Sequence, residues 1–147
     1  MKNLHFFHIP IAYLLLYTLF ILVSGIWLFL LSQGLNGTEG IVATLGKIIS
    51  APEAKSLHNM IEVATPHLFA MGTLIFVVAH FLLFSTKISQ KTSLIVALVL
   101  FGLALLNIVS YGAISFGLLV SGWIKLISMF LFVMLFVVML FMVAFSL

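Results

Sequence analysis

The sequence contains no cysteine, no arginine and no aspartate, and only 6% of its 147 residues are charged. Without cysteine the chain forms no disulfide bond, thiolate metal site, iron–sulfur cluster or covalently attached c-type haem. Lysine without arginine makes a poor nucleic-acid surface, and no phosphate loop, dinucleotide fingerprint or serine-hydrolase motif is present. These absences argue against hydrolytic enzymes, nucleic-acid-binding proteins and proton pumps that rely on buried carboxylates.

Hydrophobic residues make up 65% of the chain, a proportion that is typical of proteins whose solvent is lipid. A membrane-spanning helix needs about 20 mainly apolar residues. Four stretches meet this requirement, at about 9–31, 66–85, 92–111 and 123–145. The sequence therefore predicts one all-α domain over 1–147, an integral membrane four-helix bundle. The first stretch is too long for the apolar region of a signal peptide, and we expect it to be retained.

The segment between the first and second spans predicts one additional short helix. Ser50, Pro52 and Glu53 follow a capping-box pattern with proline near the first helical turn, which favours an interfacial helix at about 51–64. Pro66 then predicts a break or a kink before the second span. The alternative is one long, bent helix across both segments.

Two other segments have a composition that predicts their surroundings. The connection at 112–122 is almost as apolar as the spans, and we expect it to be interfacial or partly re-entrant. In the first span, one stripe of aromatic and hydroxyl side chains shares a helix face: Tyr13, Tyr17, Ser24 and Trp27. We expect this stripe to face protein, although Tyr13 and Trp27 also suit a membrane–water interface.

The charged residues predict how the chain is oriented in the membrane. Lys2 precedes the first span and Lys87 and Lys91 lie between the second and third, whereas all three glutamates lie between the first and second. Because lysine is enriched in cytoplasmic connections, both termini are expected in the cytoplasm and segment 33–65 outside. Lys47, Lys55 and Lys125 run against this bias. A bacterial inner membrane is the location we expect.

Histidines are the main ionisable residues near the predicted spans, and such residues are functional candidates by default. His67 and His80 lie on the second span, 13 residues and therefore about 20 Å apart along the axis. His58 lies at the depth of His67, and His8, or His5 one turn earlier, enters from the side of His80. The placement predicts two histidine pairs at two depths.

Two neutral imidazoles from facing helices are suitable axial ligands for haem b. The helix that carries His67 and His80 resembles the ligand-bearing helices of membrane b-type cytochromes, including respiratory cytochrome b and the cytochrome b subunits of membrane hydrogenases and formate dehydrogenases. The resemblance covers about 20 residues and implies two haem b groups, with His67, His80, His58 and His8 or His5 as ligands.

A spacing of 13 residues leaves His67 and His80 about 140° apart on an ideal helix, whereas the ligands in those cytochromes share nearly the same face. A kink or bulge near Gly72 would correct the phase. The alternatives are histidines hydrogen-bonded to a neighbouring carbonyl or serine, a different metal, or a quinone. His5 and His8 are also compatible with a surface metal site or with plain interfacial histidines.

Lys125 lies just inside the fourth span, at the depth of Glu62 and of the outer end of the third span. A lysine at this depth is a candidate partner for a haem propionate, a quinone carbonyl or Glu62. The alternative is that its ammonium group extends to the membrane surface.

The leading functional hypothesis is a membrane electron-transfer protein, either a di-haem b-type cytochrome or a haem-bearing anchor subunit of a respiratory oxidoreductase. It would exchange electrons with quinone or a redox partner protein and would not be a self-contained enzyme. The alternative is a non-catalytic subunit of a larger membrane complex. A third hypothesis is a transporter for a metal ion or small solute, which four helices would support better as a homo-oligomer.

Overall fold

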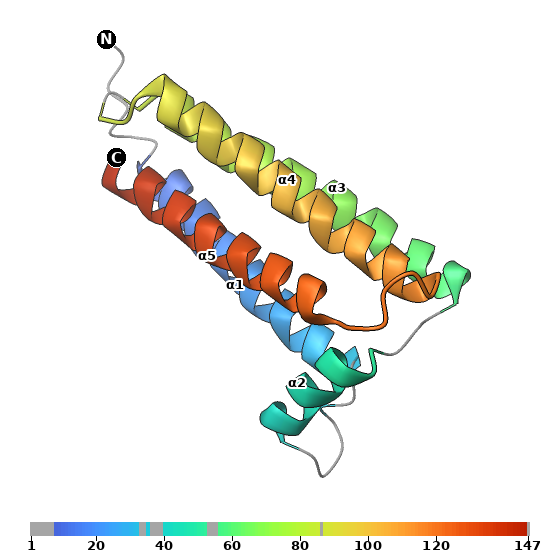
Figure 1. The fold of residues 1–147 in the computed structure, drawn as a ribbon. Coiled ribbons are helices and arrows are strands. Elements are labelled where there is room, and N and C mark those ends of the chain that lie inside the picture. The colour runs from blue at the N-terminus through green and yellow to red at the C-terminus, as the bar shows by residue number, and fades with distance from the viewer. Residues whose placement is uncertain (1–7, 33–34, 36–39, 53–55, 86, 147) are drawn as a thin grey trace.

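The computed structural model describes residues 8–32, 35, 40–52, 56–85 and 87–146, and all regular structure within these ranges is helical. The described residues form five helices: α1 (His8–Ser32), α2 (Ile41–Ser50), α3 (Leu57–Leu83), α4 (Gln90–Ser115) and α5 (Trp123–Ser146) (Figure 1). Four are long and apolar enough to cross a membrane, and α2 is a short apolar helix between the first two of these. The predicted fold class is confirmed.

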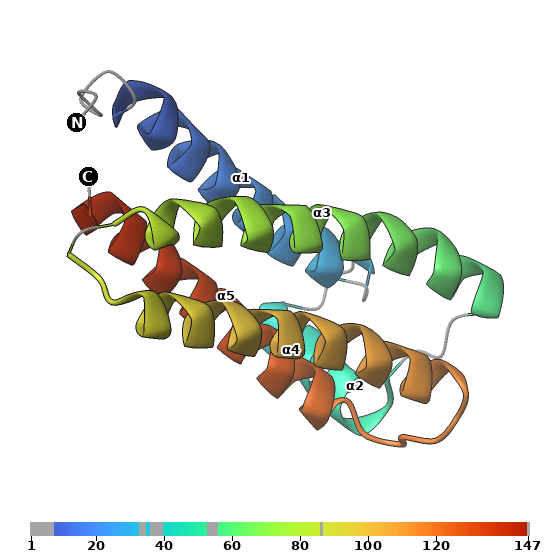
Figure 2. The ribbon, with the colours of Figure 1, turned by 90° about the horizontal axis from the view of Figure 1, so that it is seen from above.

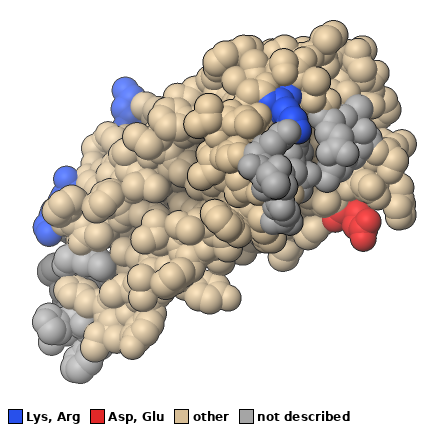
Figure 3. Space-filling view, turned by 90° about the horizontal axis from the view of Figure 1, so that it is seen from below, with Lys and Arg blue, Asp and Glu red and all other residues tan. Residues whose placement is uncertain are grey.

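The four long helices exceed the thickness of the hydrocarbon layer. They contain 24 to 27 residues, which at 1.5 Å per residue corresponds to about 36–40 Å. The hydrocarbon core of a bilayer is about 30 Å thick, so the helices are tilted or extend into the headgroup region. The face of the molecule in Figure 3 agrees with this environment, because its surface is almost entirely uncharged, with isolated lysine and glutamate side chains.

The short helix lies earlier in the chain than the predicted range of 51–64. It ends at Ser50, whose hydroxyl donates to the Gly46 carbonyl at 2.9 Å. Ser50 therefore closes a helix and does not open one. The other half of the predicted capping box, Glu53, lies outside the described residues.

The second span is one continuous helix, as in the alternative of a single long helix. Its N-cap is Ser56, whose hydroxyl accepts a hydrogen bond from the Asn59 amide at 3.3 Å. Helix α3 then continues through Pro66 without a break. A proline inside a helix costs one backbone hydrogen bond, and this cost is offset here by the packing of the rest of α3.

Packing is concentrated on three of the long helices. Helices α3 and α4 form an antiparallel hairpin, α5 packs against both, and α1 packs mainly against α5 (Figure 2). The centre is filled by side chains with almost no exposed surface, including Ile75, Val78, Leu82, Leu100, Phe132, Phe136 and Met139. In lipid these contacts stabilise the bundle through close packing, because burial of apolar surface from water is not the driving force there.

Both described ends of the chain lie at the same end of the bundle as the α3–α4 connection, and α2 lies at the other end with the α4–α5 connection (Figure 1). At the first end, Lys87 Nζ donates to the Phe145 carbonyl at 2.8 Å, near the end of α5. At the other end, Gly117 terminates α4 with a φ of 70°. Its amide donates to the Ile114 carbonyl at 3.0 Å and the Leu118 amide to Ala113 at 2.8 Å, which is a Schellman motif.

Candidate functional site

His67 and His80 both lie on the exposed surface of α3. Because α3 is an unbroken α-helix between them, their spacing leaves the two side chains about 140° apart, and no bulge at Gly72 corrects the phase. Within one chain the two imidazoles therefore face different surroundings outside the bundle.

His80 is part of a row of aromatic side chains. Its ring stacks on Phe76 with the ring centres 5.6 Å apart and meets Phe84 edge-on at 5.1 Å. The residues that share this side of α3 repeat at helical spacing and are all exposed; we call them the α3 outer face: Glu62, Phe69, Thr73, Phe76, His80 and Phe84. This face combines polar and aromatic groups and is directed away from the core of its own chain.

The predicted outer pair, His58 with His67, is not formed within one chain. Both histidines lie on α3 itself, nine residues apart, and both are exposed. A separation of nine residues corresponds to about two and a half helical turns, so the two imidazoles lie on opposite sides of the helix. The predicted pairing required His58 to lie on a short separate helix that folds back toward His67. Because α3 is continuous, that separate helix does not exist.

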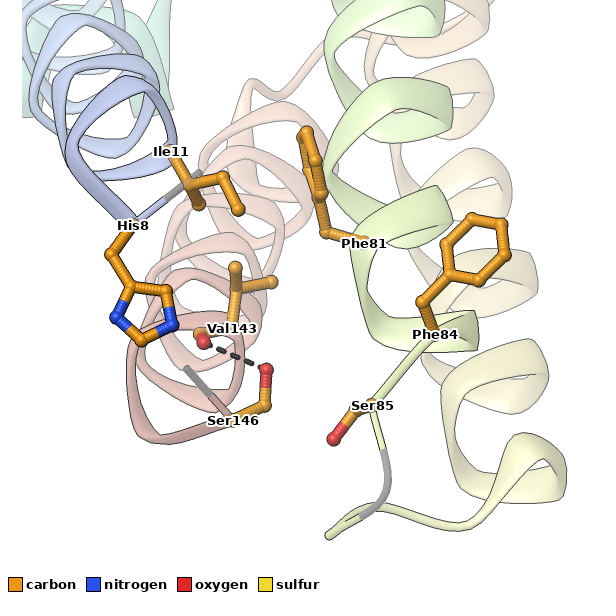
Figure 4. Close-up of a pocket in the computed structure, with 7 residues that line it drawn as sticks. All are labelled: His8, Ile11, Phe81, Phe84, Ser85, Val143 and Ser146. Atoms are coloured by element: carbon orange, nitrogen blue, oxygen red, sulfur yellow. Dashed lines mark hydrogen bonds between the residues drawn. The ribbon is translucent and has the colours of Figure 1, made fainter. Parts of the chain in front are cut away.

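The predicted inner pair lies at the correct end of the molecule. His8, at the start of α1, lines a small cavity between α1, α3 and α5, together with Ile11, Phe81, Phe84, Ser85, Val143 and Ser146 (Figure 4). Phe84 also contacts His80, so both histidines are near the same aromatic ring. The cavity volume is about 90 Å³, compared with about 300–1,000 Å³ for typical small-molecule sites. His5 lies outside the described residues.

Within one chain, His58, His67 and His80 do not pair with one another, because all three lie on the same continuous helix. Bis-histidine ligation needs two imidazoles that face each other across the iron, and His67 and His80 point outward on different sides of α3. Among the described residues, no group of three or more histidine, aspartate or glutamate side chains is arranged to hold a metal ion.

Lys125 is held between the aromatic rings of two other helices. Its ammonium lies 3.7 Å from the centre of the Tyr111 ring on α4 and 5.0 Å from that of Phe29 on α1. A lysine over aromatic faces gains cation–π stabilisation, which is larger where water is scarce. Sequence analysis identified Lys125 but missed Phe29, because no local pattern shows which residues of separate helices meet.

Helix α2 is bound tightly to the α4–α5 connection. The carbonyl of Ile49 accepts hydrogen bonds from Ser121 Oγ at 3.1 Å and from the Gly122 amide at 3.2 Å. A Cβ atom on Gly122 would collide with the carbonyl oxygen of Ile48. Glycine is therefore required here by the close approach of two backbones. The sequence indicated an apolar connection at 112–122 but not the contact between Gly122 and α2.

The aromatic stripe of α1 does not face protein within this chain. Tyr13, Tyr17, Ser24 and Trp27 are all exposed. The predicted protein contact is therefore wrong for the isolated chain, because α5 packs on the opposite side of α1 through residues such as Ile11 and Thr18.

Comparison with known proteins agrees with the architecture. Residues 37–147, more than half of the chain, match the model of a family described as a transmembrane helical domain. The match includes α2 to α5, and α1 precedes it. No curated protein and no solved structure matches the chain.

Proposed function

The chain belongs to this family of transmembrane helical domains, and on that premise we propose that it is a membrane-embedded subunit that assembles laterally with another membrane protein chain. The contact surface is the α3 outer face. The observation that carries the proposal is the outward position of two polar side chains on a helix that crosses the membrane, Thr73 beyond the middle of α3 and His80 in its last turn. Polar side chains in contact with lipid are unfavourable, whereas a neighbouring helix offers hydrogen-bond partners.

The aromatic residues of the same face support this assignment. Phe69, Phe76 and Phe84 are 77%, 62% and 67% exposed, and His80 lies between the rings of the last two. Aromatic side chains are enriched in the cores of protein interfaces because they provide large, rigid contact areas. A second helix on this face would cover the aromatic row and provide a polar partner for the imidazole.

Site-specific photocrosslinking in native membranes tests the subunit proposal. A photoreactive amino acid at Phe76, on the α3 outer face, should give one discrete crosslinked protein band. The matched control is Phe141 on α5, which is 58% exposed against 62% for Phe76. Phe141 should crosslink mainly to lipid. Equal protein crosslinking from both positions, or none from Phe76, would contradict the proposal.

A second candidate function is electron transfer through haem held between this chain and a partner. The outward direction of His67 and His80, at two levels of one helix, favours it, because imidazoles of another chain would then complete the two sites. Quinone or a redox protein would exchange the electrons. An absorption spectrum after haem-replete expression is the test: a Soret band that weakens in both His67→Ala and His80→Ala supports it, and no Soret band refutes it.

We also propose that both termini are cytoplasmic. Lys87 and Lys91 lie in or beside the α3–α4 connection, at the same end as His8 and Ser146, whereas Glu62 lies in the first turns of α3 near the other end. Lysines near the ends of spans favour the cytoplasmic side. Lys47 and Lys125 lie at the α2 end, so the described lysines are equal in number at the two ends, and the exposed Glu62 makes the α2 end the less positive one.

A further inference from the structure

Helix α2 and the connection at 116–122 form one unit at an end of the bundle. The unit, which we call the interfacial plate, is fixed by the two hydrogen bonds to the Ile49 carbonyl and by the backbone contact at Gly122. Ile48 and Thr44 are the buried residues of α2, and Ile48 lies directly against Gly122. Two segments more than sixty residues apart in the chain therefore lie together as a single surface.

The exposed part of the plate is apolar. Val42, Leu118 and Val120 are 85%, 76% and 84% exposed. Large aliphatic side chains with this exposure are unfavourable in water and favourable at the edge of the acyl chains. Val42 lies on α2, and Leu118 and Val120 lie in the connection, so the apolar surface forms only when the two segments are packed together.

Helix α2 also has a polar side, which lies on a different face of the helix from its apolar side. Lys47 is exposed and lies about 140° around the helix from Val42. A short helix with an apolar side and a lysine on another side is suited to lie in the plane of the membrane interface. Figure 1 shows α2 turned across the axis of the bundle, which agrees with that position.

The tryptophans place the plate at the level of the interface. Trp123 is the first residue of α5, directly after Gly122, and Trp27 lies in the last two turns of α1, at the same end of the bundle. Both are 54% exposed. Exposed tryptophan concentrates at the boundary between headgroups and acyl chains. These are the two tryptophans of the chain.

We infer that the interfacial plate is a lipid-binding surface that lies in the headgroup–acyl boundary of one leaflet, with Val42, Leu118 and Val120 in the hydrocarbon and Lys47 in the headgroup region. Its ligand is the bilayer surface and not a second protein chain. The surface binds lipid whether or not the α3 outer face has a partner.

Nitroxide labelling tests the inference directly, because the chain has no cysteine of its own. Single variants Val42→Cys, Val120→Cys and Lys47→Cys are labelled in liposomes, with Phe141→Cys as the reference for a lipid-exposed position on α5. The measured quantity is the ratio of collisions with oxygen, which partitions into lipid, to collisions with a water-soluble nickel complex. Val42 and Val120 should give a ratio several-fold above that of Lys47 and close to that of Phe141.

A ratio at Val42 and Val120 equal to that at Lys47 would overturn the inference, because the plate would then lie in water. A second measurement uses the unmodified chain and lipids brominated at different depths. Stronger tryptophan quenching by bromine near the headgroups supports the interfacial position. Stronger quenching by bromine near the acyl-chain ends would place the plate inside the bilayer and would also overturn the inference.

Discussion

Single residues determine how the helices meet at the α2 end of the molecule. Gly122 allows the α4–α5 connection to approach the backbone of α2, and Lys125 links α5 to aromatic rings on α1 and α4. Each contact joins segments that are distant in sequence. Substitutions at these positions should therefore affect the whole bundle and not only one helix.

Gly122→Ala should lower the free energy of unfolding by about 1–3 kcal/mol, because the added Cβ forces α2 and the connection apart. The measurement is a denaturant titration in detergent micelles. The matched control is Gly102→Ala in α4, where a Cβ would meet nothing within 4 Å. The control should be neutral or stabilising by up to about 1 kcal/mol. Equal effects of the two substitutions would show that the close contact is absent.

Tyr111→Leu should also destabilise the protein, by about 0.5–2 kcal/mol, because it removes the ring that lies 3.7 Å from the Lys125 ammonium. Tyr17→Leu is the control, since Tyr17 is 67% exposed on α1, and a surface substitution should change stability by less than about 0.5 kcal/mol. The same titration measures both. A loss no greater than that of the control would mean that the ring does not stabilise the lysine.

Sequence reasoning identified His67, His80, His58, His8 and Lys125 as the unusual residues, but it did not reveal which of them face inward. The reason is visible at neighbouring positions: Ile75 is fully buried and Phe76 is 62% exposed, although both are strongly apolar. In a water-soluble protein, a buried position and an exposed position usually carry side chains of different polarity. In lipid both surroundings are apolar, so hydrophobic periodicity does not distinguish the core from the outside.

At the level of elements, the sequence predicted four long helices and a short one, and the structure confirms this set. Length and apolar content are sufficient for that prediction, because backbone groups in lipid must be satisfied within a helix. The start of α3 was not predictable in the same way. Ser50 and Ser56 are both acceptable capping residues, and only the structure shows that Ser56 caps a helix that continues through Pro66.

Pro66→Ala should increase the amide-exchange protection of the segment around residues 62–70 and stabilise α3 by up to about 3 kcal/mol, since it restores a backbone hydrogen bond inside the helix. Hydrogen exchange followed by mass spectrometry measures the effect. Pro10→Ala is the control, because Pro10 lies in the first turn of α1, where amides have no helical partner. If Pro10→Ala protects its segment as much as Pro66→Ala does, the effect is not specific to a helix interior.

For the whole molecule, the combined distribution of lysines and glutamates predicts which end faces the cytoplasm. Gln90→Cys, at the α3–α4 connection, should resist an impermeant maleimide in intact cells and react after permeabilisation. Ser50→Cys, at the exposed end of α2, should react in intact cells. Both variants start from a chain without cysteine, so each signal comes from one site. The reverse labelling pattern would show that the termini face outward.

We propose that the α3 outer face binds another protein chain in the membrane. Native mass spectrometry of the protein, released from lipid nanodiscs prepared without detergent, measures this directly. We expect a mass greater than that of one chain, which is lost in the double variant Phe76→Ala and His80→Ala and kept in Phe141→Ala on α5. A mass of one chain with lipid alone would show that the α3 outer face has no protein partner.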